Sequence, residues 1–111
     1  MPYSENIFDV TDYRGKIVIF TRKKWKEKRS DHPELDKKLF IECLKLCIAD
    51  PDEVWEDYED GRRKRCYYRK YSEFSYVKAV VWVRNNPCLV ISAYEINKIK
   101  ERNYPELRRL R

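Results

Sequence analysis

The sequence predicts an α+β domain in which an N-terminal β-hairpin and two helices pack on an antiparallel sheet of three or four strands. Two observations carry this prediction. Apolar residues recur at three- and four-residue spacing most clearly over residues 35–49, whereas elsewhere they stand in short β-branched or aromatic runs bounded by turn residues. A chain of 111 residues has room for one such domain. We place it at residues 1–98 and expect a basic C-terminal tail over 99–111.

The hairpin and a first helix are expected before residue 30. Residues 6–10 and 16–21 are apolar, β-branched runs, and the turn-rich segment between them ends in Gly15. Residues 22–29 (RKKWKEKR) predict a short basic helix, with Thr21 as its N-cap and Trp25 as its large apolar side chain. We expect the cations of this helix to face water or a ligand.

The second helix is expected over residues 35–49. Its predicted core face consists of Leu35, Leu39, Phe40, Cys43, Leu46 and Cys47. Pro33 suits the first helical position, and Asp31 or His32 suits the cap before it. The Asp50-Pro51 pair then ends the helix.

The second half of the chain predicts strands. Residues 54–60 form either a short strand or an extended connector, and three strands are expected at 66–71, 76–84 and 88–94. The last of these expected strands places Leu89, Ile91 and Ala93 on one face and Ser92 with Tyr94 on the other.

An open sheet face is expected to carry the function. Helices that cover one face of an antiparallel sheet leave the other face free to contact solvent. Polar and aromatic side chains on that second face are therefore the first place to look for a site.

The charge pattern favours a polyanion as the partner. The net charge is +6, and the two signs are segregated: residues 22–29 and 62–65 are basic, while residues 50–60 are acidic. Phosphates attract such a basic surface and nucleic-acid bases stack on Tyr and Trp, so RNA is the expected partner. The alternative is that Lys and Arg only solvate a small domain.

Several other classes of protein are disfavoured. Two glycines, Gly15 and Gly61, supply neither a P-loop nor a dinucleotide fingerprint, so no small-molecule cofactor is expected. A serine-hydrolase nucleophile elbow is also absent from the sequence. No run approaches the roughly 20 apolar residues of a membrane span, so no membrane partner is expected.

The four cysteines are expected to be free thiols. No apolar signal segment begins the chain and no C-x-x-C pair occurs, a pattern typical of a reducing cytoplasm. Cys43 and Cys47 stand four residues apart on one helix face, which keeps half of a zinc site open as an alternative. Buried cysteine also behaves as a small hydrophobe, and we expect no metal.

The candidate catalytic residues are His32, Arg69, Ser92 and Tyr94. RNA cleavage needs a group to deprotonate the 2′-hydroxyl, a group to protonate the leaving oxygen, and positive charge near the phosphorane. His32 is the only histidine and exchanges a proton near neutral pH. Arg69 offers a forked cation for phosphate, and Tyr94 offers a phenol.

Each candidate also has a purely structural interpretation. His32 can serve as a helix cap. Arg69 can pair with the acidic segment 50–60, and Tyr94 can be an amphipathic ring at a strand end.

The order of these motifs resembles that of a known group of proteins. Phe20-Thr21 and Trp25 come first, and His32-Pro33-Glu34-Leu35 follows. The later motifs are Asp50-Pro51-Asp52-Glu53-Val54, Tyr67-Tyr68-Arg69, a Val-rich strand and Ile91-Ser92-Ala93-Tyr94. Over residues 7–98 this order resembles the phage-associated branch of the barnase–EndoU–colicin–RelE superfamily of metal-independent ribonucleases.

This resemblance implies an endoribonuclease, often toxin-like, with His32, Arg69 and the Ser92-Ala93-Tyr94 element at the site. Ser92 stands where Thr is more usual in the family. The resemblance makes a protein antitoxin or inhibitor a further candidate partner. With one histidine, the general base is Glu34, Glu73 or His32 itself, the last with Tyr94 or a Lys as the acid.

Two further hypotheses concern the basic helix and a different class of function. Nonspecific contacts to the RNA backbone are assigned to Arg22, Lys23, Lys26 and Arg29. The alternative to an enzyme is a non-catalytic RNA- or partner-binding module with the same fold. After the endoribonuclease and the binding module, a zinc-stabilised adaptor is the third hypothesis for the function.

Overall fold

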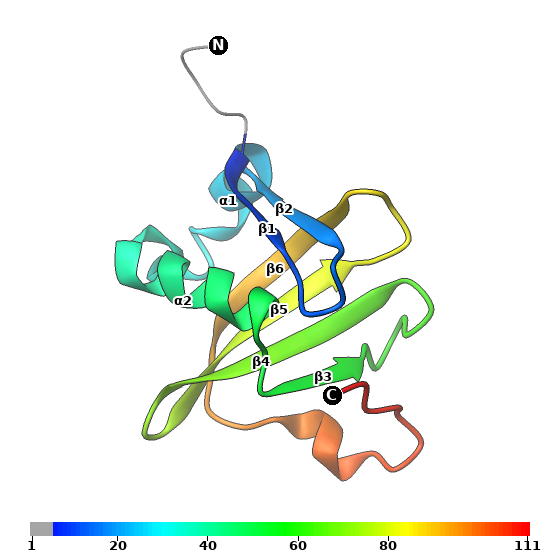
Figure 1. Cartoon of the computed structure of the whole chain (residues 1–111). Coiled ribbons are helices and arrows are strands. Elements are labelled where there is room, and N and C mark those ends of the chain that lie inside the picture. Colours follow the sequence, from blue (N-terminus) through cyan, green and yellow to red (C-terminus); the bar gives the residue numbers. More distant parts are fainter. Residues whose placement is uncertain (1–5) are drawn as a thin grey trace.

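Six strands form one mixed sheet in the computed structural model, which describes residues 6–111 (Figure 1). The strands are β1 (Asn6–Thr11), β2 (Ile17–Thr21), β3 (Glu53–Glu56), β4 (Lys64–Ser72), β5 (Ser75–Trp82) and β6 (Cys88–Ile96). Their order across the sheet is β1-β2-β6-β5-β4-β3. The α+β class is confirmed, but the sheet is larger than the three or four strands expected from the sequence.

The extra strands join the sheet at both edges. β2 lies parallel to the start of β6, with Val18 opposite Cys88 and Ile19 opposite Leu89. The N-terminal hairpin is therefore part of the sheet and not a separate layer. At the other edge, β3 pairs antiparallel with β4, which resolves the connector or strand alternative for the acidic segment in favour of a strand.

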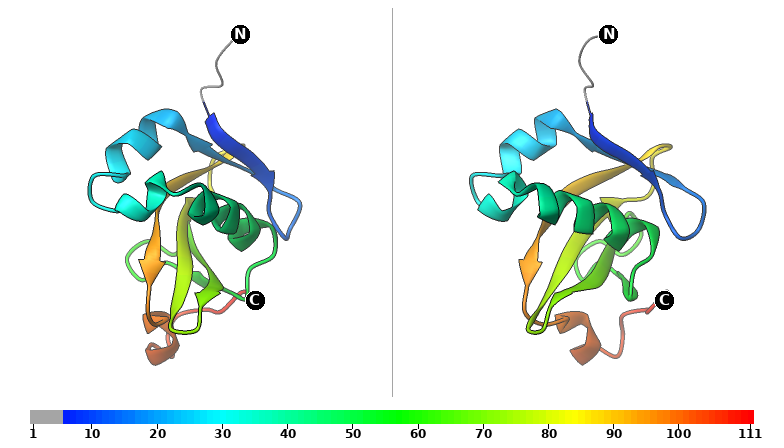
Figure 2. Two further views of the ribbon diagram at one scale, coloured as in Figure 1. Left: turned by 90° about the vertical axis from the view of Figure 1, so that its left-hand side faces the viewer. Right: turned by 60° about the vertical axis from the view of Figure 1, so that its left-hand side comes forward.

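Two α-helices and two 3₁₀ turns complete the fold. They are α1 (Arg22–Lys28), η1 (Pro33–Asp36), α2 (Lys38–Ala49) and η2 (Lys100–Asn103). The second helix begins at Lys38 and not at Leu35, because Pro33–Asp36 forms a separate 3₁₀ turn and Lys37 is extended. Figure 2 shows α2 lying across one face of the sheet.

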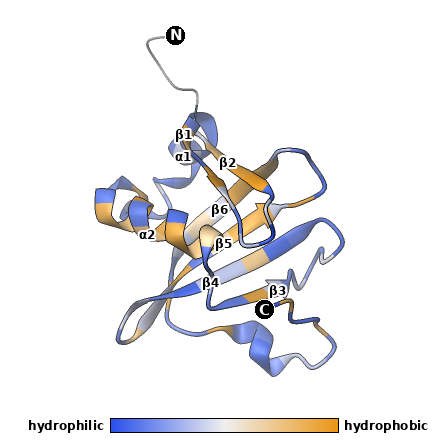
Figure 3. Cartoon of the chain, in the orientation of Figure 1, coloured by the Kyte–Doolittle hydropathy of each residue, from blue (hydrophilic) through white to orange (hydrophobic). Residues whose placement is uncertain are grey.

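The α2 side of the sheet holds the main core. The buried residues of α2 are Phe40, Leu44, Cys47 and Ile48, and they pack against apolar side chains of β2, β4, β5 and β6. The predicted core face was partly wrong, since Leu39 and Leu46 are 68% and 51% exposed. Figure 3 shows apolar residues gathered on β2, β5 and β6, whereas the loop between β3 and β4 is hydrophilic.

An irregularity in β6 shifts its alternation. Val80 pairs with Ser92 but Val81 pairs with Val90, so Ile91 has no partner in the register. Such a bulge changes which residues face the core. Val90 and Ala93 are buried whereas Leu89 and Ile91 are not, so the predicted grouping of Leu89, Ile91 and Ala93 on one face is wrong.

The second face of the sheet carries a smaller core beneath the C-terminal segment. Its buried members are Trp55, Cys66, Tyr68 and Ile99. After η2 the chain returns along β3, where Leu110 N–H donates to the Val54 carbonyl at 2.7 Å. Residues 99–111 thus pack against the sheet (Figure 1). Within the described part of the chain, every helix is too short or too polar to cross a membrane.

Candidate functional site

A row of polar and aromatic side chains crosses the sheet on the face opposite α2. The register places Tyr68 of β4 beside Lys78 of β5, and Lys78 beside Tyr94 of β6. Their neighbours Val77 and Ala79 point to the α2 core, so these three point the other way. Ser92 lies on this same face, two residues before Tyr94, and is half-buried.

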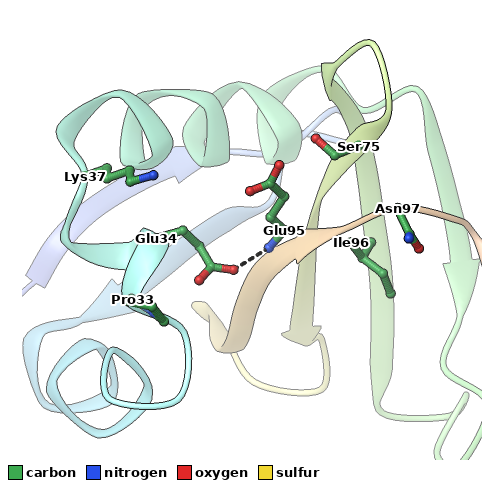
Figure 4. Close-up of a pocket in the computed structure, with 7 residues that line it drawn as sticks. All are labelled: Pro33, Glu34, Lys37, Ser75, Glu95, Ile96 and Asn97. Atoms are coloured by element: carbon green, nitrogen blue, oxygen red, sulfur yellow. Dashed lines mark hydrogen bonds between the residues drawn. The ribbon is translucent and has the colours of Figure 1, made fainter.

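His32 reaches this face from the edge of β6. β2 pairs only with the start of β6, so the later N–H groups of β6 need other partners. The turn η1 lies along that edge, and its Glu34 carboxylate accepts the Glu95 N–H at 2.8 Å. Figure 4 shows this bond beside a pocket of about 580 Å³ that Glu34 and Glu95 line together with Lys37.

The His32 ring stacks on the Tyr94 ring. Their centroids are 4.7 Å apart and the planes differ by 19°. The His32 side chain makes no capping hydrogen bond to η1, while Pro33 takes the first helical position as predicted. The capping interpretation therefore fails for the His32 side chain, and the imidazole is held against a phenol ring.

A buried cation lies next to this stacked pair. The Lys78 ammonium is 5.6 Å from the Tyr94 ring centroid and 5.3 Å from that of Tyr68. Its Nζ is 3.4 Å from Oε1 of Glu101, a residue of η2. The Tyr68 hydroxyl donates to the other oxygen of the same carboxylate. The Glu101 carboxylate thus binds both the Lys78 ammonium and the Tyr68 hydroxyl.

Lys78 is held in its charged form. Burial by itself lowers the pKa of Lys78, but the acidic groups Cys66, Tyr94 and Glu101 raise it more, and the net direction is upward. Burial and the bond to Glu101 raise the pKa of the Tyr68 hydroxyl, which therefore stays a donor. At neutral pH the cluster therefore holds a protonated ammonium paired with the Glu101 carboxylate, beside His32, the side chain suited to move a proton there.

Arg69 lies on the opposite face of the sheet. It pairs in register with Val77, on the α2 side. Its guanidinium donates to the carbonyl oxygen of Asp50 at 2.6 Å and to the Asp50 carboxylate at 3.3 Å. The expected convergence of Arg69 with His32 and Tyr94 is not found, and its pairing with the acidic segment, at Asp50 after α2, is the interaction observed.

Lys78 and Glu101 were not among the site residues predicted from the sequence. Lys78 was open to detection, because a lysine inside the run Tyr76-Val77-Lys78-Ala79-Val80 of a buried strand needs a partner. Glu101 was not, since it stands in a segment that was expected to be a tail.

The basic helix α1 lies beside the strand edge that η1 covers. The four expected RNA contacts are exposed: Arg22, Lys23 and Lys26 lie on α1, and Arg29 is its C-cap. Thr21 caps the helix as predicted, accepting the Lys24 N–H at 3.1 Å. Trp25 fastens α1 to η1, because its indole N–H donates to the Leu35 carbonyl at 2.8 Å.

The cysteines are free thiols, three of them buried. Cys47 donates to the Val77 carbonyl at 3.5 Å, and burial raises its pKa. Burial likewise raises the pKa of Cys66 to about 12, so its thiol is unreactive at neutral pH. Over residues 6–111, no three His, Cys, Asp or Glu side chains are grouped so as to hold a metal ion.

The fold and the cluster define a small α+β protein with a histidine and a buried lysine on the sheet face opposite α2, and the C-terminal segment partly covers this face, which the sequence had led us to expect open. The chain belongs to the family described as phage-Barnase-EndoU-ColicinE5/D-RelE like nuclease2, whose model matches residues 6–111. No curated protein and no solved structure shows a significant match. The family membership confirms the resemblance noted in the sequence.

Proposed function

We propose that this nuclease cleaves RNA and that the reaction takes place at His32, Lys78 and Tyr94. The observation that carries the proposal is the stacked His32–Tyr94 pair with the Lys78 ammonium against the same phenol ring. His32 can transfer a proton and Lys78 carries a positive charge, and phosphodiester cleavage needs a group of each kind.

The proposed reaction is an attack of the 2′-hydroxyl oxygen on the adjacent phosphorus. The new bond joins the 2′-oxygen to phosphorus, and the bond from phosphorus to the 5′-oxygen breaks. The base takes the proton of the 2′-hydroxyl and the acid gives one to the leaving 5′-oxygen, which leaves a 2′,3′-cyclic phosphate. Lys78, whose side chain is 5% exposed and bound to Glu101, acts on the developing negative charge of the phosphorane through its field and not by contact.

His32 is the proposed proton-transfer group, and Tyr94 positions its ring. Glu34 is the favoured carboxylate partner, because it stands two residues after His32 and its bond to the Glu95 N–H fixes it beside β6, the strand that carries Tyr94. Ser92 would be an auxiliary hydrogen bonder beside Tyr94. Lys78 replaces Arg69 in this proposal as the cation of the site.

The test is cleavage of RNA by the purified protein in EDTA, because the proposed scheme uses no metal ion. We expect cyclic-phosphate products, and a loss of rate of at least about 100-fold in both His32→Ala and His32→Phe. His32→Phe keeps an aromatic ring on Tyr94 and so separates proton transfer from packing. Asp31→Ala, an exposed neighbour, is the matched control and should stay within about twofold.

Full activity in both His32 variants would remove His32 from the mechanism. A wild-type protein that leaves RNA intact would instead favour the second candidate, a non-catalytic RNA-binding module. The exposed cations of α1 favour that candidate. It predicts binding that weakens steeply with salt and is lost when Arg22, Lys23, Lys26 and Arg29 are replaced in a folded protein.

A toxin role with a protein antitoxin remains a prediction of the same proposal. Expression of the wild-type chain should arrest growth of the host cell, and His32→Phe should not. Growth arrest by both chains at equal expression would separate toxicity from RNA cleavage.

A further inference from the structure

A second pocket of about 540 Å³ lies at the other end of the sheet. Five arginines and one glutamate contribute to its lining: Arg14, Arg62, Arg65, Arg84, Arg108 and Glu56. They come from the β1–β2 turn, the β3–β4 loop with the start of β4, the loop after β5, and the C-terminal segment. Figure 1 shows these turns on the same side of the molecule.

Two of the five arginines have carboxylate partners. Arg14 binds the Asp12 carboxylate at 2.9 Å, and Arg108 binds Glu56 at 3.2 Å. Within residues 6–111, Arg62, Arg65 and Arg84 form no ion pair. Three guanidinium groups therefore line the pocket without a carboxylate of the described part of the chain in ion-pair contact.

Two of these three arginines, Arg65 and Arg84, are ordered by backbone contacts. Arg84 Nε donates to the Arg62 carbonyl at 3.1 Å, and Arg65 donates to the carbonyls of Gly61 and Lys64. The Nε of Arg65 is a buried donor with no acceptor. Side chains fixed in this way bind a ligand at a smaller entropic cost than free surface arginines do.

We propose that this arginine pocket binds a phosphate group, as a site separate from the His32 cluster. Guanidinium groups match phosphate oxygens through paired N–H donors, and the excess positive charge suits a phosphate dianion or two adjacent phosphodiesters. A volume of this size holds a nucleotide-sized ligand.

The pocket and the His32 cluster do not coincide. Tyr94 stands six positions after Cys88, which adjoins the loop that carries Arg84, and six steps correspond to about 20 Å along a strand. Arg65 also shares the α2 side of β4 with Tyr67, whereas Tyr94 lies on the opposite face. Phosphate binding here requires no cleavage chemistry, so it can be tested whether or not the protein is an active nuclease.

The test measures binding by calorimetry at about 50 mM salt, where phosphate contacts are strongest. The probes are inorganic phosphate, pyrophosphate, and a 2′-O-methyl RNA decamer with or without a 5′-phosphate. The 2′-O-methyl group removes the nucleophile, so the decamer stays intact. Tighter binding of the 5′-phosphorylated decamer assigns a terminal phosphate, and equal binding of both decamers assigns backbone phosphodiesters.

The variants are Arg62→Gln/Arg84→Gln and, because Arg84 supports the loop, Arg62→Glu alone. We expect at least about tenfold weaker binding of the preferred probe in both. If backbone phosphates are bound, the double variant should also flatten the slope of log K against log salt by about 1.4. The matched controls are Lys38→Gln/Lys98→Gln and Lys38→Glu, which carry the same charge changes on exposed lysines outside the pocket lining and should stay within twofold.

Three outcomes would overturn the proposal. They are no binding of any phosphate probe by the wild-type protein, equal losses in the pocket and control variants, and a deca-glutamate peptide binding as tightly as the phosphate probes. The last outcome would assign the pocket to an acidic protein segment.

Discussion

Lys78 is the residue on which the candidate site depends, and its energetics differ from those of a surface cation. Its side chain is 5% exposed and that of Glu101 is 1% exposed. A buried ion pair adds little net stability, because the desolvation of both charges offsets their attraction. Removal of one partner is costly, however, since the other charge is then left buried and alone.

A double-mutant cycle at Lys78 and Glu101 tests this argument. Lys78→Met and Glu101→Gln should each lower the free energy of unfolding by about 3–5 kcal/mol, and the double variant by less than the sum of the two. Urea unfolding at pH 7 measures all four proteins. Additive losses would show that the two groups do not interact in the folded protein.

Single residues also show where sequence reasoning succeeds and fails. The only histidine and the tyrosine near the end of β6 were selected for their chemistry, and the fold does bring these two rings together. Arg69 was selected in the same way, but the two-residue period of a strand puts its side chain on the other face from Tyr94. Knowledge of the register, which no local pattern supplies, was needed to separate them.

The first helix is a short element held by its N-cap and by one central side chain. α1 has seven residues and none is buried, so its formation depends on the Thr21 cap and on Trp25. Helices of this length are not stable in isolation. The order of the cations that we assign to RNA contact therefore depends on the Thr21 cap and on the Trp25 contact.

Thr21→Ala should destabilise this element. The substitution removes the acceptor of the Lys24 N–H, and we expect the free energy of unfolding to fall by about 1 kcal/mol. Thr21→Ser keeps the hydroxyl and is the control, with a loss of a few tenths of a kcal/mol. Urea unfolding measures both proteins. Equal losses in the two would assign the effect to packing of the strand end and not to the cap.

The predicted core-facing residues were partly wrong in two elements, α2 and β6, each for a physical reason. The spacing over residues 35–49 fits several helical faces, and the sequence alone did not exclude Leu39 and Leu46 in favour of Leu44 and Ile48. The bulge at Ile91 reverses the alternation in the first half of β6. Both outcomes depend on what the element packs against, which is a tertiary property.

At the scale of the whole molecule, the architecture depends on contacts between segments far apart in the chain. The class and the order of most elements follow from local patterns, because periodicity and turn residues are local. The parallel pairing of β2 with β6 and the return of the C-terminal segment along β3 have no local signal. The six-stranded sheet and the placement of Glu101 both result from these contacts.

Two buried carboxylates stabilise such long-range contacts. Asp12, in the β1–β2 turn, accepts the Tyr67 hydroxyl of β4 at 2.8 Å, and it also binds the Arg14 guanidinium. Glu53 of β3 accepts from Arg102 of η2 at its edge of the sheet. Burial raises the pKa of each carboxyl, but the hydrogen bonds and the arginines lower it more, so both lie below their ordinary values.

The acid limb of stability should therefore depend on Asp12. A carboxyl whose pKa is lower in the folded than in the unfolded state stabilises the protein fully above the unfolded value, about 3.9 for Asp. This contribution disappears as the pH falls through the lower, folded value. Asp12→Asn should lower the free energy of unfolding by about 1–3 kcal/mol at pH 7, and the difference from wild type should narrow below about pH 4.

Urea unfolding at pH values from about 2 to 7 measures this dependence. Asp9→Asn is the matched control, because Asp9 is exposed on the neighbouring strand β1 and its replacement makes the same change in charge. A constant difference between Asp12→Asn and wild type across the acid range would mean that the contact of Asp12 with Tyr67 stabilises the fold through shape and not through charge. The link between the hairpin and β4 would then be insensitive to pH, and acid unfolding would have to begin elsewhere, with Glu53 as the next carboxyl to replace.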